Sequence, residues 1–534
     1  MVREGREAWG SRLLAGFVAA GLSLLAFSAS ADAATIPVTN TSDAAPAPPG
    51  SLRAAIEAAN SDTDLDVVDA SGVTGTINLG TALPILAEDI EIRGPGAGAL
   101  TVRRGIGVMS SFRILTVNPG VTAAISDLTI ASGNVTGSSD GGAGIYNNRG
   151  TVTLRGTVVT GNVNSGSSNG ADGGGILNWS ISPASAATMT IVDSAISGNR
   201  AAGSGAGIDN ADFSTLTVRR SLVSGNTSGE GAGCMGGGGI KNDGVLRVEN
   251  STVAGNSVPG PPVPAHGGGI ISCGDSGSAT IVNSTIASNS AGTGANLSID
   301  RLGSAATLRS SVVADPRGGG ANCFVDGPPD PATLTSTGFN LASDASCKLT
   351  NPTDQPSTNP LLGPLASNGG PTLTMALPLN SPAVDKGIRN GLTTDQRGLT
   401  RPVDFPKIPN APGGDGTDIG AFEVQAPPEP PGPSNEFSFG KVKKNKKKGT
   451  AKLTIEIEQG PGELDLAKTK KVKADDEAVE AEGDEKLNIK PKGKATKKLR
   501  KNGNAKVKAE VTYTPDGGEP NMRSKKVKLK LKRR

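Results

Sequence analysis

The sequence predicts an all-β protein: a right-handed parallel β-helix followed by a small basic β-sandwich. Two observations predict the β-helix, namely a glycine-rich phrase that recurs every 30 to 32 residues and apolar residues at strand spacing after each copy. Alternating apolar and charged residues near the C-terminus predict the sandwich. The composition agrees, since the 534 residues include 75 glycines and only 3% aromatic residues.

The recurring phrase has the pattern Gly-x-Gly-Ile-x-Asn, with serine in place of asparagine in the last copy. Its isoleucines are 31, 32, 32 and 30 residues apart, a period typical of solenoids. The copies occupy residues 142–147, 173–178, 205–210, 237–242 and 267–272. One such coil cannot bury its apolar face alone, whereas stacked coils share a continuous core.

A second asparagine follows each phrase and fixes the register of the coils. These residues are Asn162, Asn199, Asn226, Asn256 and Asn289. Apolar residues lie ten, eight and three positions before each one, and a threonine or serine lies five before. Steps of two match a strand, and the odd step between them indicates a bend. We therefore expect Val223, Val253 and Ile286 in one interior ladder and the asparagines in a stacked ladder.

The N-terminal region contains a predicted export signal and a helix. Residues 1–33 combine three arginines, an apolar run and an Ala-Asp-Ala cleavage site, the pattern of a secretory signal peptide. An uncleaved anchor is the alternative. Residues 34–64 are predicted to hold a linker and a helix capped by Ser51, which covers the first coil. Residues 65–356 are the predicted β-helix, with early strands at 75–79, 89–93 and 113–117.

Three stretches resemble families of exported bacterial proteins. Ser51-Leu52-Arg53-Ala54-Ala55 is similar to the motif of CSLREA-type proteins, although Gly50 and Ala54 replace the usual Cys and Glu. The repeats at 120–315 resemble polymorphic outer-membrane protein repeats, which implies a surface-displayed and often adhesive β-helix. Residues 357–424 resemble a choice-of-anchor Q domain, through motifs at 359–362, 381–385, 394–398 and 418–423. That resemblance implies a domain at the end of the β-helix.

Charged residues are concentrated in the choice-of-anchor-like segment. They are Asp385, Asp395, Arg397, Arg401, Asp418 and Glu423. They could form an active cluster, but we expect an ion-paired cap over the last coil, because interleaved arginines and carboxylates neutralise one another.

The C-terminal region differs in charge from the rest of the chain. A proline-rich linker is predicted at 425–435, and residues 436–534 carry 29 Lys and Arg against 15 Asp and Glu, a net +14. The remainder has a net charge of −11. The region resembles basic immunoglobulin-like modules of exported proteins. Basic clusters attract polyanions, so we expect cell-envelope polyanions rather than nucleic acid as partners, with a partnerless solubilising module as the alternative.

The four cysteines allow three pairings. Cys234 and Cys273 flank successive phrases, and Cys323 and Cys347 bracket an irregular segment, which favours the pairs 234–273 and 323–347. Disulfides persist in oxidising compartments, so this expectation agrees with export.

No catalytic residue, metal site or cofactor is predicted. The pectate-lyase-like solenoid to which this fold corresponds hosts polysaccharide lyases and hydrolases, but the only histidine, His266, is interpreted as a loop residue. The outward-facing column six positions before each ladder asparagine contains one acid; its members are Gly156, Asp193, Arg220, Asn250 and Asn283. Asp193 with Arg220, and Arg219 or Arg220 with Glu249, are interpreted as solvated cross-coil pairs. Fold alone does not imply an activity.

The remaining candidate site is aromatic. Tyr146 and Trp179 come from successive coils and could form a small glycan-binding patch, although a tryptophan covering the core edge is the alternative. The sequence therefore predicts a secreted, surface-associated protein with a structural, adhesive or ligand-displaying role. The competing hypothesis is a carbohydrate-active enzyme with a divergent site. No transmembrane anchor is predicted.

Overall fold

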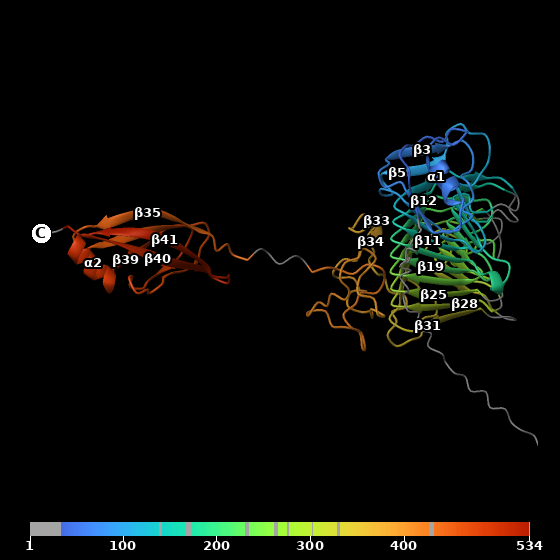
Figure 1. The fold of residues 1–534 in the computed structure, drawn as a ribbon. Coiled ribbons are helices and arrows are strands. Elements are labelled where there is room, and N and C mark those ends of the chain that lie inside the picture. Colours follow the sequence, from blue (N-terminus) through green and yellow to red (C-terminus); the bar gives the residue numbers. More distant parts are fainter. Residues whose placement is uncertain are drawn as a thin grey trace, which may run out of the picture. The chain divides into compact units, whose positions relative to one another are not determined.

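The computed structural model describes residues 34–137, 141–166, 172–229, 234–260, 265–274, 277–301, 303–327, 332–426 and 432–532. The predicted signal peptide lies outside these ranges. The chain forms two compact units, residues 1–426 and 427–534 (Figure 1). In the described ranges no helix is long and apolar enough to cross a membrane.

The first unit is a right-handed parallel β-solenoid of about ten turns, which confirms the predicted fold class. Three long parallel sheets, here called A, B and C, form its walls. Sheet A contains β1 (Thr35–Pro37), β2 (Asp66–Asp69), β4 (Ile90–Arg93), β7 (Thr122–Ser126), β11 (Thr151–Arg155), β15 (Thr188–Val192), β19 (Thr215–Arg219), β22 (Val245–Glu249), β25 (Ser278–Val282), β28 (Ala305–Arg309) and β31 (Thr333–Ser336).

The other two walls follow the same coils. Sheet B contains β3 (Gly75–Leu79), β5 (Leu100–Arg104), β8 (Thr129–Ala131), β12 (Val158–Thr160), β16 (Ala195–Ser197), β20 (Leu222–Ser224), β23 (Thr252–Ala254), β26 (Thr285–Ala287), β29 (Val312–Ala314) and β32 (Leu341–Ala342). Sheet C contains β6 (Leu115–Val117), β10 (Ile145–Asn148), β14 (Ile176–Trp179), β18 (Ile208–Asn210), β21 (Ile240–Asn242), β24 (Ile270–Ser272), β27 (Leu297–Ile299) and β30 (Cys323–Val325). A short sheet joins β9 (Asn134–Val135), β13 (Val163–Asn164) and β17 (Arg200–Ala201), and a 3-10 turn, η1, spans Pro183–Ser185.

The interior consists of stacked columns in the predicted register. Val223 pairs with Val253, which pairs with Ile286, and all three are fully buried. From β7–β8 to β28–β29, each coil turns between sheets A and B through one left-handed residue, for example Asp193 at φ 52° and Asn250 at φ 44°. This corner is the predicted bend between the two apolar pairs.

Polar ladders run through the coils beside the apolar core. In the predicted ladder, each amide nitrogen donates to the next Oδ1 at 2.9–3.0 Å, from Asn162 through Asn289. The last asparagine of the glycine phrase forms a second ladder, in which Asn147, Asn178 and Asn210 each donate to the next coil at 2.7–2.8 Å. Serine hydroxyls at the A–B corner accept backbone N–H groups of the preceding coil. Buried amides and hydroxyls are therefore satisfied coil by coil.

The solenoid begins earlier than the predicted residue 65. Strand β1 pairs in parallel with β2, so residues 35–37 belong to sheet A rather than to a linker. Pro37 is tolerated there because an edge strand does not need every N–H group. Helix α1 (Leu52–Ala59) follows, and the Ser51 side chain caps it by accepting the N–H of Ala54 at 3.2 Å. Its apolar face joins the core at the first coils, as predicted (Figure 1).

The choice-of-anchor-like segment lies along the flank of the solenoid, whereas we expected it over the last coil. Arg401 Nη1 donates to Asn250 Oδ1 at 2.7 Å, and Thr252 Oγ1 donates to Gln396 Oε1 at 2.6 Å. Further along, Ile388 N donates to Ser310 Oγ. The segment contains the short hairpin β33 (Leu365–Ala366) and β34 (Thr374–Met375), visible beside the coils in Figure 1. Residues 353–355 bond instead to residues 339–342 of the last coil.

The second unit consists of two antiparallel sheets around one core. One contains β35 (Phe437–Asn445), β36 (Thr450–Ile457) and β39 (Gly483–Ile489), and the other β37 (Gly462–Leu466), β38 (Asp475–Val479), β40 (Asn504–Pro515) and β41 (Asn521–Lys530). The alternating strands are therefore confirmed. Helix α2 (Lys494–Asn502) was not predicted.

Candidate ligand-binding site on the outer face of sheet C

The outer face of sheet C carries two columns of side chains. Isoleucine and asparagine of each glycine phrase point inward, so the residue between them and the residue after them point outward. The first column is Tyr146, Leu177, Asp209, Lys241, Ile271, Ser298 and Phe324, each in register with the next. Asn148 and Trp179 begin the second column, which continues with Ala211, Asp243, Cys273 and Asp300 after the strands.

The two predicted aromatic residues meet on this face. The ring centroids of Tyr146 and Trp179 are 6.3 Å apart with an interplanar angle of 49°. The guanidinium carbon of Arg113 lies 4.9 Å from the Tyr146 centroid, and that of Arg149 lies 5.9 Å from the Trp179 centroid. Burial raises the pKa of Tyr146. The cluster combines aromatic surface, which contacts sugar rings, with guanidinium groups, which bind carboxylates.

An ion triad occupies the next coils. Lys241 Nζ lies 2.6 Å from Asp243 Oδ2 and 3.5 Å from Asp209 Oδ2. Burial raises the pKa of Asp209 well above its ordinary value, against the opposing charge of Lys241. Burial alone lowers the pKa of Lys241, but the carboxylates of Asp209 and Asp243 outweigh it and raise that pKa. The ammonium group of Lys241 is therefore shared by the carboxyl groups of Asp209 and Asp243 in a site that is largely shielded from solvent.

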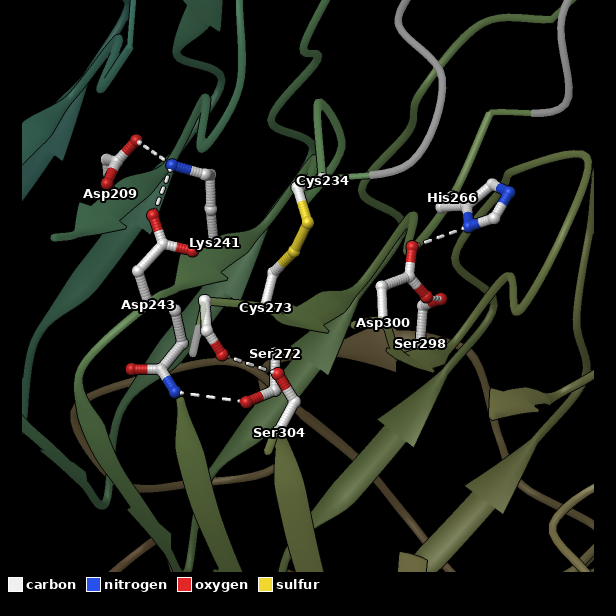
Figure 2. Close-up of a disulfide and its surroundings, with 12 residues drawn as sticks. Asp209, Cys234, Lys241, Asp243, His266, Ser272, Cys273, Ser298, Asp300 and Ser304 are labelled. Atoms are coloured by element: carbon white, nitrogen blue, oxygen red, sulfur yellow. Dashed lines mark hydrogen bonds and ion pairs between the residues drawn. A yellow bond between two sulfur atoms is a disulfide. The ribbon is translucent and has the colours of Figure 1, made fainter. Parts of the chain in front are cut away.

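A disulfide covers the face beside this triad. Cys234 and Cys273 are bonded, with a Cα–Cα distance of 5.8 Å, and they link the loop before β21 to the end of β24. Figure 2 shows the disulfide between the triad and the pair formed by His266 and Asp300. Cys323 and Cys347 form the second bond, so both favoured pairings are confirmed.

The imidazole of His266 is held in place by a carboxylate and an aromatic ring. Its Nδ1 lies 2.7 Å from Asp300 Oδ2, and Ser298 Oγ donates to Asp300 Oδ1 at 2.7 Å. Phe324 packs edge-on against the imidazole at 4.9 Å between centroids. Since Ser298 bonds the carboxylate rather than the imidazole, the three residues do not form a nucleophile–base pair.

The other predicted polar groups are mutually neutralised. Arg220 binds Asp193 through two contacts of 2.7 Å, as expected of a cross-coil pair. Glu249 pairs with Arg247 of its own strand rather than with Arg219 or Arg220. Among the described residues no group of three or more His, Cys, Asp or Glu side chains could hold a metal ion.

The charged residues of the flanking segment form a buried structural cluster. Arg401 and Glu423 are fully buried as side chains and meet at 2.9 Å, while Arg397 and Asp395 meet at 2.7 Å. Burial and the charge of Glu423 raise the pKa of Asp418 to about 8. Their position between the segment and the coils excludes contact with a large substrate.

Sequence reasoning missed Asp209, Lys241 and Asp243. The signal was available, because Asp209 and Lys241 each follow the isoleucine of a glycine phrase, and the 32-residue spacing stacks them. Comparison with known proteins adds no identity: no protein-family model matches the chain, and no curated protein matches it. The fold and the site therefore define the protein only as a disulfide-bonded β-solenoid joined to an antiparallel β-unit.

Proposed function

We propose that the protein is a secreted or cell-surface bacterial adhesin that binds a glycan on the outer face of sheet C. The observation that carries this proposal is the cluster of Tyr146 and Trp179 with Arg113 and Arg149. Aromatic rings supply contact area, and each guanidinium supplies planar donors for a carboxylate or hydroxyl. A bound sugar would contact both coils at once.

Several features support export and surface display. Two disulfides are expected of an oxidising compartment. The signal-like residues 1–33, the CSLREA-type motif and the choice-of-anchor Q-like segment at 357–424 agree with this location. In this proposal the displaying β-helix extends from residue 35 to residue 356, and helix α1 covers its first coils.

The basic unit at 436–534 is proposed to retain the protein at the envelope. Strands β40 and β41 place Lys506 opposite Lys528 and Lys508 opposite Lys526. Like charges directly opposite destabilise a sheet, so an anionic polymer at this face would relieve repulsion. Binding of the full chain to purified envelopes should weaken steeply with salt, and replacing Lys506 and Lys528 with Gln should reduce it at low salt. Salt-independent binding would contradict electrostatic retention.

The glycan proposal is tested by a glycan array followed by calorimetry. Trp179→Ala should reduce affinity for any glycan found by about tenfold or more, in line with loss of a buried aromatic contact. Phe213→Ala is the matched control, because Phe213 is an exposed aromatic residue outside sheet C. Equal binding by both variants would place the ligand elsewhere. The absence of any glycan ligand would refute the proposal.

The ion triad favours one alternative, a carbohydrate-active enzyme. A carboxyl group with a pKa raised by burial that still reaches the surface, such as that of Asp243, suits a general acid. Release of reducing or unsaturated ends from polysaccharides, abolished by Asp243→Asn and retained in Asp193→Asn, would establish this alternative.

A further inference from the structure

A groove separates the outer face of sheet A from the loop at residues 388–391. Its volume is about 540 Å³, within the range of about 300–1,000 Å³ that holds small ligands. The groove lies on a different wall of the solenoid from Tyr146 and Trp179. It is formed by strands β22, β25 and β28 together with the flanking segment.

The floor of the groove crosses three successive coils. Arg247, Thr280 and Thr307 occupy one column, each in register with the next, and Arg309 lies two positions after Thr307 on the last of these strands. Coils stack about 4.8 Å apart, so Arg247 and Arg309 are separated by two coil steps. The hydroxyls of Thr280 and Thr307 make no hydrogen bond to a described residue, whereas Thr337 Oγ1 at the edge of the groove donates to Leu308 O at 3.1 Å.

The wall of the groove is fixed to the solenoid. Asn283 Nδ2 donates to Ile388 O at 3.0 Å, and Asn390 Nδ2 donates to Asn283 Oδ1 at 2.8 Å. Asn390 itself has a left-handed conformation, at φ 53°. Arg389 projects from this loop, and its Nε lies 3.6 Å from Asp415 Oδ2. The groove is therefore preformed, and binding does not need to order its wall.

The charges of the groove favour an anion. Three arginines line it against one acid, Asp415. Arg247 is engaged by Glu249 and Arg389 by Asp415, whereas Arg309 is exposed and makes no ion pair with any described residue. Guanidinium groups bind carboxylates through two parallel hydrogen bonds. Hydroxyl groups beside such a site suit a ligand that is itself rich in hydroxyls.

We infer that this groove binds an acidic glycan, with Arg309 receiving a uronate carboxylate and Thr280 and Thr307 contacting sugar hydroxyls. A glycan chain running along the solenoid axis would meet Arg247 on the first coil, Thr280 on the second, and Thr307 with Arg309 on the third. A simple anion would use the arginines alone. The threonine column is thus the feature that favours carbohydrate over a phosphate polymer.

The test uses the purified full chain with oligogalacturonate and its methyl ester, which keeps the hydroxyls and removes the charge. Arg309→Gln should weaken oligogalacturonate binding by about tenfold, equivalent to about 1.4 kcal/mol, and should reduce the salt dependence of the affinity. The matched control is Arg200→Gln, which removes an exposed arginine from strand β17 and should change neither quantity. Arg309→Gln and Arg200→Gln have the same net charge, so any attraction of oligogalacturonate to the basic C-terminal unit is equal in the two variants.

A second variant tests the hydroxyl contacts. Thr280→Val combined with Thr307→Val keeps the shape of the floor, and it should weaken oligogalacturonate binding while leaving the salt dependence unchanged. Measuring Arg309→Gln in a Trp179→Ala background separates this groove from the sheet C site, because the tenfold loss should persist when the sheet C site is disabled. Equal binding of methyl ester and acid, or identical affinities of Arg309→Gln and Arg200→Gln, would overturn the proposal. Inorganic polyphosphate binding as tight as oligogalacturonate, with no effect of the threonine changes, would show a general anion site instead.

Discussion

Asn256 offers the sharpest test of how the solenoid is held together. Its Oδ1 accepts the backbone N–H of Asn226 at 3.1 Å and the Asn226 amide at 2.9 Å. Its Nδ2 donates to Asn289 Oδ1 and to Val223 O, both at 2.9 Å. Asn256→Ala removes all four hydrogen bonds from a fully buried position.

The size of the effect follows from what remains unpaired. The Asn226 amide keeps its bond to Ile196 O, but the Asn226 backbone N–H loses its acceptor. A buried orphaned donor costs about 1–3 kcal/mol, and each further lost hydrogen bond contributes about 1 kcal/mol. We expect the free energy of unfolding to fall by about 4–6 kcal/mol, measured by urea denaturation.

Two companion variants make the result interpretable. Asn78→Ala removes an exposed asparagine from strand β3 and should cost no more than about 0.5 kcal/mol. Asn256→Asp keeps the acceptor but must be protonated to donate, so its stability should decline as pH rises. If Asn256→Ala is no more harmful than Asn78→Ala, the ladder does not stabilise the solenoid.

Three further predictions concern other parts of the first unit. Val253→Asp should abolish protease resistance, because an unpaired charge would be buried in the core at a cost of several kcal/mol; an unchanged digestion pattern would contradict the register. Since the folded pKa of Asp418, about 8, exceeds its ordinary value of 3.8, its contribution is fully present below pH 3.8 and lost as pH rises through 8. Asp418→Asn should therefore flatten the pH dependence of the unfolding free energy, a difference of at most about 6 kcal/mol. Replacing Cys323 and Cys347 with Ser should cost about 3 kcal/mol, and an unchanged urea midpoint would argue against this disulfide as a stabiliser.

The coils were predictable because the glycines, asparagines and apolar residues that specify them recur at a nearly constant spacing. A constant spacing between asparagines fixes a ladder wherever coils stack, and the same logic would have located Asp209 beside Lys241. The position of the flanking segment was not predictable, because contacts such as Arg401 with Asn250 join residues 151 apart in sequence. Helix α2 was missed because only Ala495 and Leu499 form its buried face, too short a pattern to outweigh seven surrounding polar residues.

The flanking segment also determines how the solenoid would respond to pulling. A force applied through the C-terminal unit enters the first unit at residue 426, which is joined to the end of the flanking segment and not to the last coil. Hydrogen bonds connect the segment to successive coils, with Thr252 and Asn283 as donors and Asn250 and Ser310 as acceptors. The applied force is therefore distributed over the hydrogen bonds to several coils, so that these bonds must break together. The terminal coil does not carry the force alone. For a protein tethered at its C-terminal end, the flanking segment would keep the last coils of the solenoid from unfolding one after another under force.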